Sequence, residues 1–309
     1  MRMKVDVGHC FALTTGILML ASTSLYSACP AQGVLRQDFG QAQAPDSASG
    51  FRSVKLANLE VAVWLPQTTS PAPLIIFSHG FHGTNVQSRF LMEAMANDGY
   101  IVVAPNHDDA RSTGGGGGMS ALRPQQSFKN PRQWTDVTYK DRHDDIVALL
   151  SALKADDDYN RRIDWSRLAL AGHSLGGYTV LGLGGAWPSW RLPGIKAILA
   201  LSPYCMPYVG HDSLKNIQVP VMYQGGTRDF GITPSLKRSG GAFQSTASPC
   251  YFVEFDRAGH FSFSNLNGNH EQEKLISHYS LAFLDKFVKG QCSARPDIKL
   301  NGVSCLEIK

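Results

Sequence analysis

Short apolar runs alternate with helix-length segments along this sequence, and the alternation limits the possible folds more than any other feature. Each run has the length and composition of a buried strand, and turn residues separate it from the next segment. The pattern is typical of a largely parallel sheet with crossover helices. The predicted strands are LEVAVWL, PLIIFSH, YIVVAP, LALAGHS, AILALSP, VPVMYQG and YFVEF.

Two of the intervening segments carry apolar stripes at helical spacing, over 146–153 and 276–287, which we interpret as core faces. The chain has 309 residues, of which 43% are hydrophobic, and this suits one sizeable core. We therefore predict a single α/β domain over 51–309, with a mostly parallel sheet covered by helices on both faces. The short interval between AILALSP and VPVMYQG leaves no room for a large cap domain.

The N-terminal 28 residues have the composition of an export signal: basic residues, then an apolar run, then small residues. We predict an export signal over 1–28, a flexible segment over 29–50, and a periplasmic, secreted or envelope-associated protein. An uncleaved membrane anchor is the alternative, because no charged residue occurs from Val7 to Ala28. The letters YSAC, ending at Cys29, are similar to a bacterial lipobox, so membrane attachment through a lipid on Cys29 stays open.

Export would place four cysteines in an oxidising compartment, where three pairings are possible. We predict a Cys292–Cys305 disulfide that closes the C-terminal tail, 290–309. Closing a loop of that size stabilises a protein by roughly 3 kcal/mol in the chain-entropy model. Cys205 follows a predicted strand and Cys250 precedes one, which places them near opposite ends of a parallel sheet, so their pairing stays open.

The segment 108–134 contains five consecutive glycines and no clear periodicity. A loop of this length is usually functional or disordered. Two interpretations are open: a surface insertion, or a mobile flap over the functional site.

The letters GHSLG, centred on Ser174, follow a predicted strand and precede a helix-compatible segment. A serine in a tight packing turn would give the same letters. The strand–turn–helix context, however, is that of a nucleophile elbow, in which glycines at positions 172 and 176 relieve backbone crowding. We therefore predict that Ser174 is a catalytic nucleophile.

A serine hydroxyl needs a base and an orienting acid, and both candidates follow in the order Ser, acid, His. Asp229 comes just after the strand VPVMYQG, and His260 comes after the strand YFVEF. Asp256 is a competing orienting acid, although its position suggests the end of a strand. The backbone N–H groups of Phe81 and Leu175 are the predicted oxyanion-hole donors, because in a hydrolase with such an elbow the residue after the serine supplies one donor and the loop after the strand PLIIFSH supplies the other.

Four motifs together, FSHGFHG, GHSLGGYT, GGTRD and GHFSF, resemble the α/β-hydrolase superfamily. More narrowly, they resemble its dienelactone-hydrolase-like branch, which includes platelet-activating-factor acetylhydrolases and bacterial cutinases. The resemblance covers about 51–289 and implies an α/β-hydrolase fold that cleaves esters. It implies a substrate-stacking role for Tyr204 in LSPYC, and it places His82 in the substrate pocket where smaller residues are frequent.

The remaining acidic and histidine clusters, NHDDARS and DRHDD, could suggest a metal site. We interpret them as a solvated helix face, because no zinc-binding spacing is present and a serine triad needs neither metal nor cofactor. The net charge of +4 is scattered along the chain, so we expect no nucleic-acid partner. The pattern carries no prediction of oligomeric state.

These observations predict an exported serine hydrolase acting on small-molecule or lipid esters, with short-acyl or aromatic esters expected first. Phospholipid or polyester substrates, as in cutinases, are the bolder variant, and a peptidase could use the same groups. A non-catalytic envelope binding protein on a hydrolase fold is the alternative of a different class. Reaction of Ser174 with a fluorophosphonate would separate the enzyme from the binding protein.

Overall fold

A computed structural model describes residues 50–111 and 123–309, all of which belong to one compact unit of the chain. The predicted export signal, Cys29 and nearly all of the segment 29–50 lie outside the described residues, as does 112–122 in the glycine-rich segment. Among the helices of the described ranges, none combines the length and apolarity that a bilayer crossing requires.

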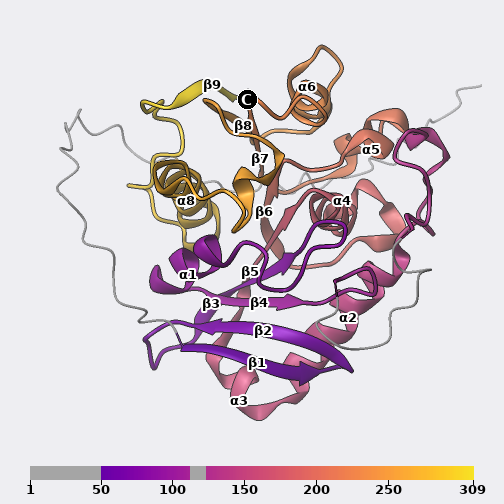
Figure 1. Cartoon of the computed structure of the whole chain (residues 1–309). Helices are drawn as coiled ribbons and strands as arrows, with labels where there is room; N and C mark the ends of the chain where they lie inside the picture. The colour runs from indigo at the N-terminus through magenta and orange to yellow at the C-terminus, as the bar shows by residue number, and fades with distance from the viewer. Residues whose placement is uncertain (1–49, 112–122) are drawn as a thin grey trace, which may run out of the picture. The chain divides into compact units, whose positions relative to one another are not determined.

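The described strands form one mixed sheet in the order β1-β2-β4-β3-β5-β6-β7-β8-β9 (Figure 1). The strands from β4 to β8 are parallel neighbours, whereas β1, β2 and β9 pair antiparallel at the two edges. The predicted α/β fold with a mostly parallel sheet is therefore confirmed. The strands are β1 (Gly50–Leu56), β2 (Leu59–Leu65), β3 (Ala72–Ser78), β4 (Ile101–Pro105), β5 (Ile163–His173), β6 (Ile195–Leu201), β7 (Val221–Gly226), β8 (Cys250–Phe255) and β9 (Val303–Ile308).

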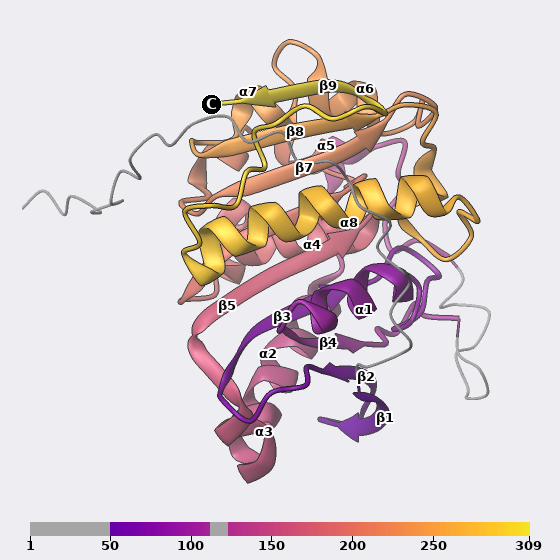
Figure 2. The same ribbon diagram turned by 90° about the vertical axis from the view of Figure 1, so that its left-hand side faces the viewer.

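Helices cover both faces of the sheet, with α1 and α8 on one face and α2 and α4 on the other (Figures 1 and 2). The α-helices are α1 (Arg89–Asn97), α2 (Lys140–Ala155), α3 (Asp157–Arg162), α4 (Leu175–Leu181), α5 (Met206–Gly210), α6 (Thr233–Lys237), α7 (Ala242–Ser245) and α8 (His270–Leu284). Shorter helical turns are η1 (Pro131–Gln133), η2 (Gly182–Ala186), η3 (Pro188–Trp190), η4 (Leu214–Asn216), η5 (His260–Phe263) and η6 (Asp285–Lys289).

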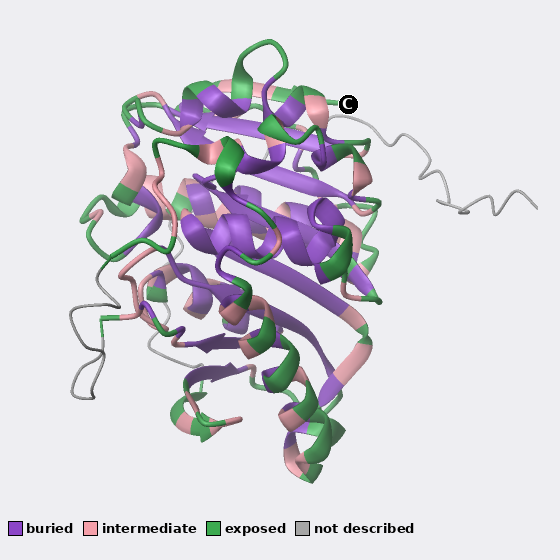
Figure 3. Ribbon diagram, turned by 90° about the vertical axis from the view of Figure 1, so that its right-hand side faces the viewer, coloured by how far each residue is buried: buried purple, intermediate pink, exposed green. Residues whose placement is uncertain are grey.

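The core consists of two apolar layers separated by the sheet. Strand β3 illustrates the division, because Leu74 and Ile76 join the layer under α2 and α4, whereas Ile75 and Phe77 join the layer under α1 and α8. The predicted helical stripes supply both layers, and the central strands are buried on both sides (Figure 3). The connection from β6 to β7 carries α5 and η4, both short.

The predicted Cys292–Cys305 disulfide is wrong. Cys305 is a free thiol in β9, where strand pairing sets it opposite Glu254 of β8. Cys292 is disulfide-bonded, but not to Cys305. The tail is therefore not a small closed loop: its last residues complete the edge of the sheet, and that pairing fixes where Cys305 lies.

Cys205 and Cys250 are also free thiols, and both are buried. Burial raises the pKa of each thiol to about 12, so neither is a reactive thiolate near neutral pH.

Candidate active site

Ser174 occupies the sharp turn between β5 and α4. Its backbone has φ 55° and ψ −115°, a conformation that a residue with a side chain rarely adopts. Three hydrogen bonds hold it there: the Ser174 N–H donates to Leu201 O at 3.0 Å, and the Ser174 carbonyl accepts from the N–H groups of Tyr178 and Tyr204 at 3.2 and 2.9 Å. The turn therefore presents the serine side chain in a strained, well-supported position.

The glycines beside Ser174 are required by close backbone approach. A Cβ at position 176 would lie 1.9 Å from Ser78 O, and one at position 172 would lie 2.3 Å from Gly176 O. Both distances are far below any tolerated contact, and both partners are backbone atoms that cannot turn aside. This crowding agrees with the interpretation of GHSLG as an elbow between a strand and a helix.

His260 reaches Ser174 from the loop after β8. Its Nε2 lies 3.0 Å from Ser174 Oγ, and its side chain is 26% exposed. The His260 carbonyl accepts a hydrogen bond from Nε2 of His173, at 2.9 Å. Burial, together with the nearby His260, lowers the pKa of His173 to about 3, so His173 is neutral and acts as a fixed donor.

Gln87 joins this support to the loop after β3. Its amide nitrogen donates to Nδ1 of His173 at 2.7 Å, and its carbonyl oxygen accepts from the N–H of Gly80 at 3.0 Å. A chain of hydrogen bonds therefore runs from the loop after β3 through Gln87 and His173 to the backbone of His260. No role for Gln87 or His173 is predicted from the sequence, because an amide nine residues beyond β3 carries no local signal.

Asp229 lies on the far side of the His260 ring, but it does not contact the ring directly. The distance from His260 Nδ1 to Asp229 Oδ1 is 3.6 Å, longer than a hydrogen bond. The hydroxyl of Ser202 stands between them: its oxygen is 2.7 Å from His260 Nδ1, and it donates a short hydrogen bond to Asp229 Oδ2. Ser202 was not predicted from the sequence, where its one signal is its position at the end of β6, the strand that pairs with β5.

The carboxyl of Asp229 is ionised despite its burial. Burial alone would raise its pKa, but contacts with His260, Ser202 and Thr233 outweigh that effect and lower the pKa below its usual value. The structure thus brings together Ser174, His260 and Asp229, with Ser202 between the last two. Asp256, the competing carboxylate, lies elsewhere, on a hollow described below.

The amides of Phe81 and Leu175 are both available to a bound group. Neither donates a hydrogen bond to another group within the part of the chain that the structure describes. Leu175 is the first residue of α4 and directly follows Ser174, and Phe81 begins the turn after β3. Backbone donors that no other group uses are what an oxyanion requires.

A buried ion pair holds the loop that carries Phe81. The guanidinium of Arg142, on α2, contacts both carboxylate oxygens of Asp109 at 2.8 Å and donates to His79 O at 2.7 Å. Asp109 also accepts from the N–H of His82 at 3.3 Å. Burial alone would raise the pKa of Asp109, but Arg142 outweighs it and lowers that pKa to about 2. This pair fixes the backbone on both sides of Phe81.

The predicted solvated face is therefore wrong for part of its residues. Asp144 is exposed, but His107, Asp109 and Arg142 are buried. His107 contacts Ser78 Oγ at 2.9 Å through Nε2 and Asp145 at 2.8 Å through Nδ1. Helical spacing indicated which side of α2 faces the core, but it could not indicate that the segment after β4 folds against the same helix.

A pocket of about 490 Å³ opens beside the loop after β3 and the His260 loop. His82 lines it and stacks on Phe81, with ring centroids 3.8 Å apart. Phe261 and Leu266, which are 60% and 78% exposed, line its other side. The lining residues are Phe81, His82, Gly83, Thr84, Val86, Gln87, Arg111, Phe261, Ser264, Asn265 and Leu266.

Tyr204 is not among the residues of that pocket. It is only 7% exposed, packs against Phe128 and Trp134, and donates a hydrogen bond from its hydroxyl to Phe128 O at 2.7 Å. The described end of the glycine-rich segment therefore covers Tyr204 and packs against Phe81 through Phe128. The structure brings His82 to the pocket and leaves Tyr204 in the aromatic core beside it.

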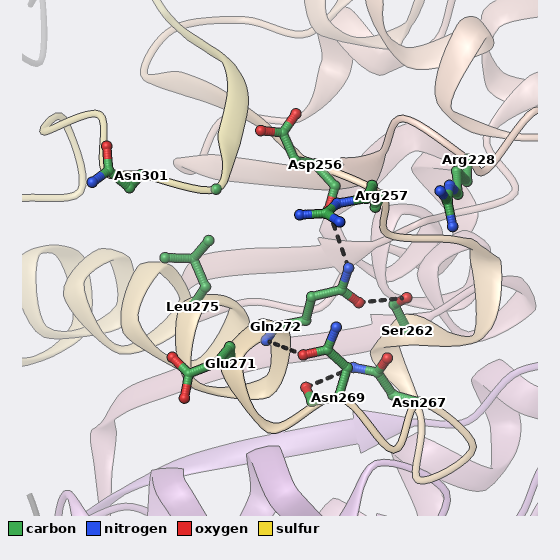
Figure 4. Close-up of a pocket in the computed structure, with 11 residues that line it drawn as sticks. Arg228, Asp256, Arg257, Ser262, Asn267, Asn269, Glu271, Gln272, Leu275 and Asn301 are labelled. Carbon is green, nitrogen blue, oxygen red and sulfur yellow. Dashed lines mark hydrogen bonds between the residues drawn. The ribbon is translucent and has the colours of Figure 1, made fainter.

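A larger and more polar hollow of about 680 Å³ lies behind the His260 loop (Figure 4). Asp256, Ser262 and Gln272 line it, and Gln272 bridges the other two by accepting from Ser262 Oγ and donating to Asp256 O, both at 3.1 Å. Neither this hollow nor the pocket of about 490 Å³ has Ser174, Asp229 or His260 among its lining residues, but the smaller pocket includes Phe81, the candidate oxyanion-hole residue. The larger hollow borders the support of the His260 loop.

A family model described as PET hydrolase-like matches residues 135–294, a stretch that includes Ser174, Asp229 and His260. Cutinase est2 of Thermobifida alba is 26% identical over 228 residues, covering 73% of this chain and 63% of that protein. Cutinase 1 of Thermobifida cellulosilytica is 25% identical over 250 residues, covering 78% of this chain and 76% of that protein. The chain thus spans just under two thirds of the length of Cutinase est2.

Proposed function

The chain belongs to the PET hydrolase-like family, and from this premise we propose that it is a serine hydrolase that cleaves carboxylic esters through an acyl-enzyme. Family membership also confirms the resemblance to the cutinase-containing branch of the α/β hydrolases. The observation that carries the proposal is the 3.0 Å contact between His260 Nε2 and Ser174 Oγ on a strained, glycine-flanked turn.

In the proposed reaction, Ser174 Oγ attacks the ester carbonyl while His260 Nε2 takes the serine proton. The carbonyl oxygen becomes an oxyanion that accepts from the N–H groups of Phe81 and Leu175. Collapse of this intermediate breaks the bond to the alcohol, which receives its proton from His260. A water molecule then repeats the sequence on the acyl-enzyme and releases the acid, which restores Ser174 and a neutral His260.

Each oxyanion donor should contribute measurably to transition-state stabilisation in this scheme. Removing one preorganised donor typically costs roughly 3 to 4 kcal/mol of transition-state stabilisation. Arg142 holds the His79 and Gly80 carbonyls before the Phe81 amide, and Asp109 accepts from the His82 N–H after it, so the pair contributes by keeping that donor in a fixed orientation.

Short-acyl and aromatic esters are the proposed first substrates, because the pocket of about 490 Å³ is walled by Phe81, His82 and Phe261. Polyester is the second candidate. The exposed Phe261 and Leu266 at the pocket wall would suit an insoluble apolar surface, and the similar proteins are named cutinases.

Rates on p-nitrophenyl esters from acetate to palmitate, with Ser174→Ala as the matched control, test this function. We expect kcat/KM to be highest on short chains and to vanish in the variant. A maximum on long chains would favour a lipid-deacylating role. A wild type no faster than Ser174→Ala on every ester would remove the esterase proposal and favour the non-catalytic binding protein or the peptidase.

We also propose that the protein is exported, on the basis of the composition of residues 1–28. Expression with and without these residues, followed by fractionation and intact mass analysis, tests the proposal. A mature chain beginning near Cys29 in the exported fraction is the expected result. A mass increase that disappears in Cys29→Ala would identify lipid attachment, and an unprocessed cytoplasmic chain would contradict export.

A further inference from the structure

The hydroxyl of Ser202 occupies the place where His260 and Asp229 would otherwise meet. Its oxygen is 2.7 Å from His260 Nδ1 and it is hydrogen-bonded to Asp229 Oδ2, whereas the nearest direct approach of Asp229 to the ring nitrogen is 3.6 Å. The acid therefore influences the imidazole mainly through an intervening hydroxyl.

Counting protons fixes the direction of these hydrogen bonds. An ionised carboxylate can only accept, so the single Ser202 proton points to Asp229. The Ser202 oxygen is then free to accept, and Nδ1 of His260 must carry a proton to donate to it. In the neutral ring this leaves the lone pair on Nε2, the nitrogen that faces Ser174 Oγ.

We propose that Ser202 is a positioning residue of this site, which holds His260 in the tautomer and orientation needed to deprotonate Ser174 and which relays the charge of Asp229 to it. The proposal deepens, and rests on, the proposed function. When His260 takes the Ser174 proton, the ring becomes positive, and the Nδ1–H···Oγ–H···carboxylate chain stabilises that charge. Ser202 keeps its own proton, so no net proton passes to Asp229.

The turn that carries Ser202 is built to hold this hydroxyl. Ser202 is fully buried and has φ 41°, a left-handed conformation unusual for a residue with a side chain. Its N–H donates to Gln224 O at 2.7 Å, and the neighbouring Leu201 carbonyl accepts from the N–H of Ser174. The same strand end therefore positions the nucleophile and the hydroxyl behind its base.

Two variants separate the hydroxyl from the backbone conformation. Both Ser202→Ala and Ser202→Gly remove the hydroxyl, but only glycine relieves the positive φ. We expect both to lower kcat by about 10- to 100-fold with KM near wild type, a loss of the size found when the hydrogen-bond partner behind a metal-bound histidine is removed. The proposal would be overturned if both variants kept a kcat within about twofold of wild type. It would also be overturned if Ser202→Ala lost activity but Ser202→Gly did not, because the loss would then come from the backbone conformation and not from the hydroxyl.

A double variant tests whether Asp229 acts through Ser202. If it does, Ser202→Ala adds no further loss when Asp229→Asn is already present, whereas independent contributions would multiply. Ser213→Ala is the matched control, because Ser213 is a buried serine of the same β6–β7 connection whose hydroxyl has no partner among the described residues. It should keep wild-type kcat and unfolding midpoint.

A spectroscopic readout makes the test independent of ester turnover. The titratable groups against which His260 packs are His173 on β5 and Asp229 after β7. We expect a downfield imidazole N–H proton resonance in wild type that is absent in His260→Gln and lost or shifted upfield in Ser202→Ala. An unchanged resonance in Ser202→Ala would refute the relay even if wild type hydrolysed no ester, whereas inactivity alone would refute only the proposed function.

Discussion

The two sides of the candidate active site are held by opposite means. The loop that carries the Phe81 amide is fixed by a buried ion pair, Arg142 with Asp109. The loop that carries His260 is fixed by hydrogen bonds between neutral groups, one accepted from His173 and one donated to Ser202. Breaking a buried pair leaves an uncompensated charge, which is costly to the fold. Breaking a neutral hydrogen bond costs far less stability. Substitutions on the Phe81 side should therefore mainly lower the free energy of unfolding, whereas substitutions on the His260 side should mainly lower kcat.

The largest expected effect falls on the His260 side, in Asp229→Asn. The amide cannot supply the negative charge that favours the Nδ1–H tautomer, so kcat should fall at least as far as in Ser202→Ala, and by up to about 10⁴-fold, the loss found where such a carboxylate contacts the imidazole directly. The free energy of unfolding should change by no more than about 1 to 2 kcal/mol, because the amide keeps hydrogen-bonding capacity. Steady-state kinetics paired with urea unfolding measure both quantities. A loss of folding that accounts for the inactivity would contradict the division between the two sides.

On the opposite side, Arg142→Met should lower the free energy of unfolding by about 3 to 5 kcal/mol, because Asp109 is left buried without its partner. The combined change Arg142→Met with Asp109→Leu should cost less than the sum of the single changes, since it removes both charges. Denaturant unfolding of wild type, Arg142→Met, Asp109→Leu and the double variant measures the coupling between the two residues as a double-mutant cycle. Additive losses would show that Arg142 and Asp109 are not coupled.

Acid should weaken the ion pair between Arg142 and Asp109. The pKa of Asp109 is lowered from 3.8 to about 2, so between these values the unfolded chain binds more protons than the folded one. Stability from this group is complete above about pH 4 and is lost as the pH falls through about 2. Thermal melts from pH 5 to pH 2 should therefore be less steep with pH in the Arg142→Met, Asp109→Leu double variant than in wild type. Equal slopes would contradict the assignment.

The smallest expected effect has the opposite sign and concerns Asp145, the partner of His107. Burial raises the pKa of Asp145 to about 6, so the folded state binds the extra proton and stability is lost as the pH rises from about 4 to about 6. Asp145→Asn should therefore have a Tm equal to wild type near pH 4 and a higher Tm at pH 8. A lower Tm at pH 8 would mean that the ionised carboxylate stabilises the fold.

The sequence predicted the parts of the fold that depend on apolar patterning. The buried central strands and the stripes of α2 and α8 were visible because each buries a continuous or periodic apolar surface. Strands β1 and β9 were missed, since edge strands expose one face and carry polar residues such as Arg52 and Glu307. The disulfide was misassigned because spacing gives loop length but not the strand pairing that fixes Cys305.

The residues of the candidate active site likewise divide into those that local sequence predicts and those that it does not. Ser174, Asp229 and His260 could be predicted because each follows a strand in a recognisable order. Ser202 and Arg142 could not, because their roles depend on distances between segments far apart in the chain. A serine at a strand end and an arginine in a charged helix have the same local sequence whether they support a site or face solvent.

Intact-mass analysis after exposure to a fluorophosphonate tests the central claim, that Ser174 is a nucleophile activated by His260. We predict that wild type gains one phosphonyl group, located on Ser174 by peptide mapping, that Ser174→Ala gains none, and that His260→Gln reacts far more slowly. A label at another residue, or equal labelling of wild type and His260→Gln, would contradict the account.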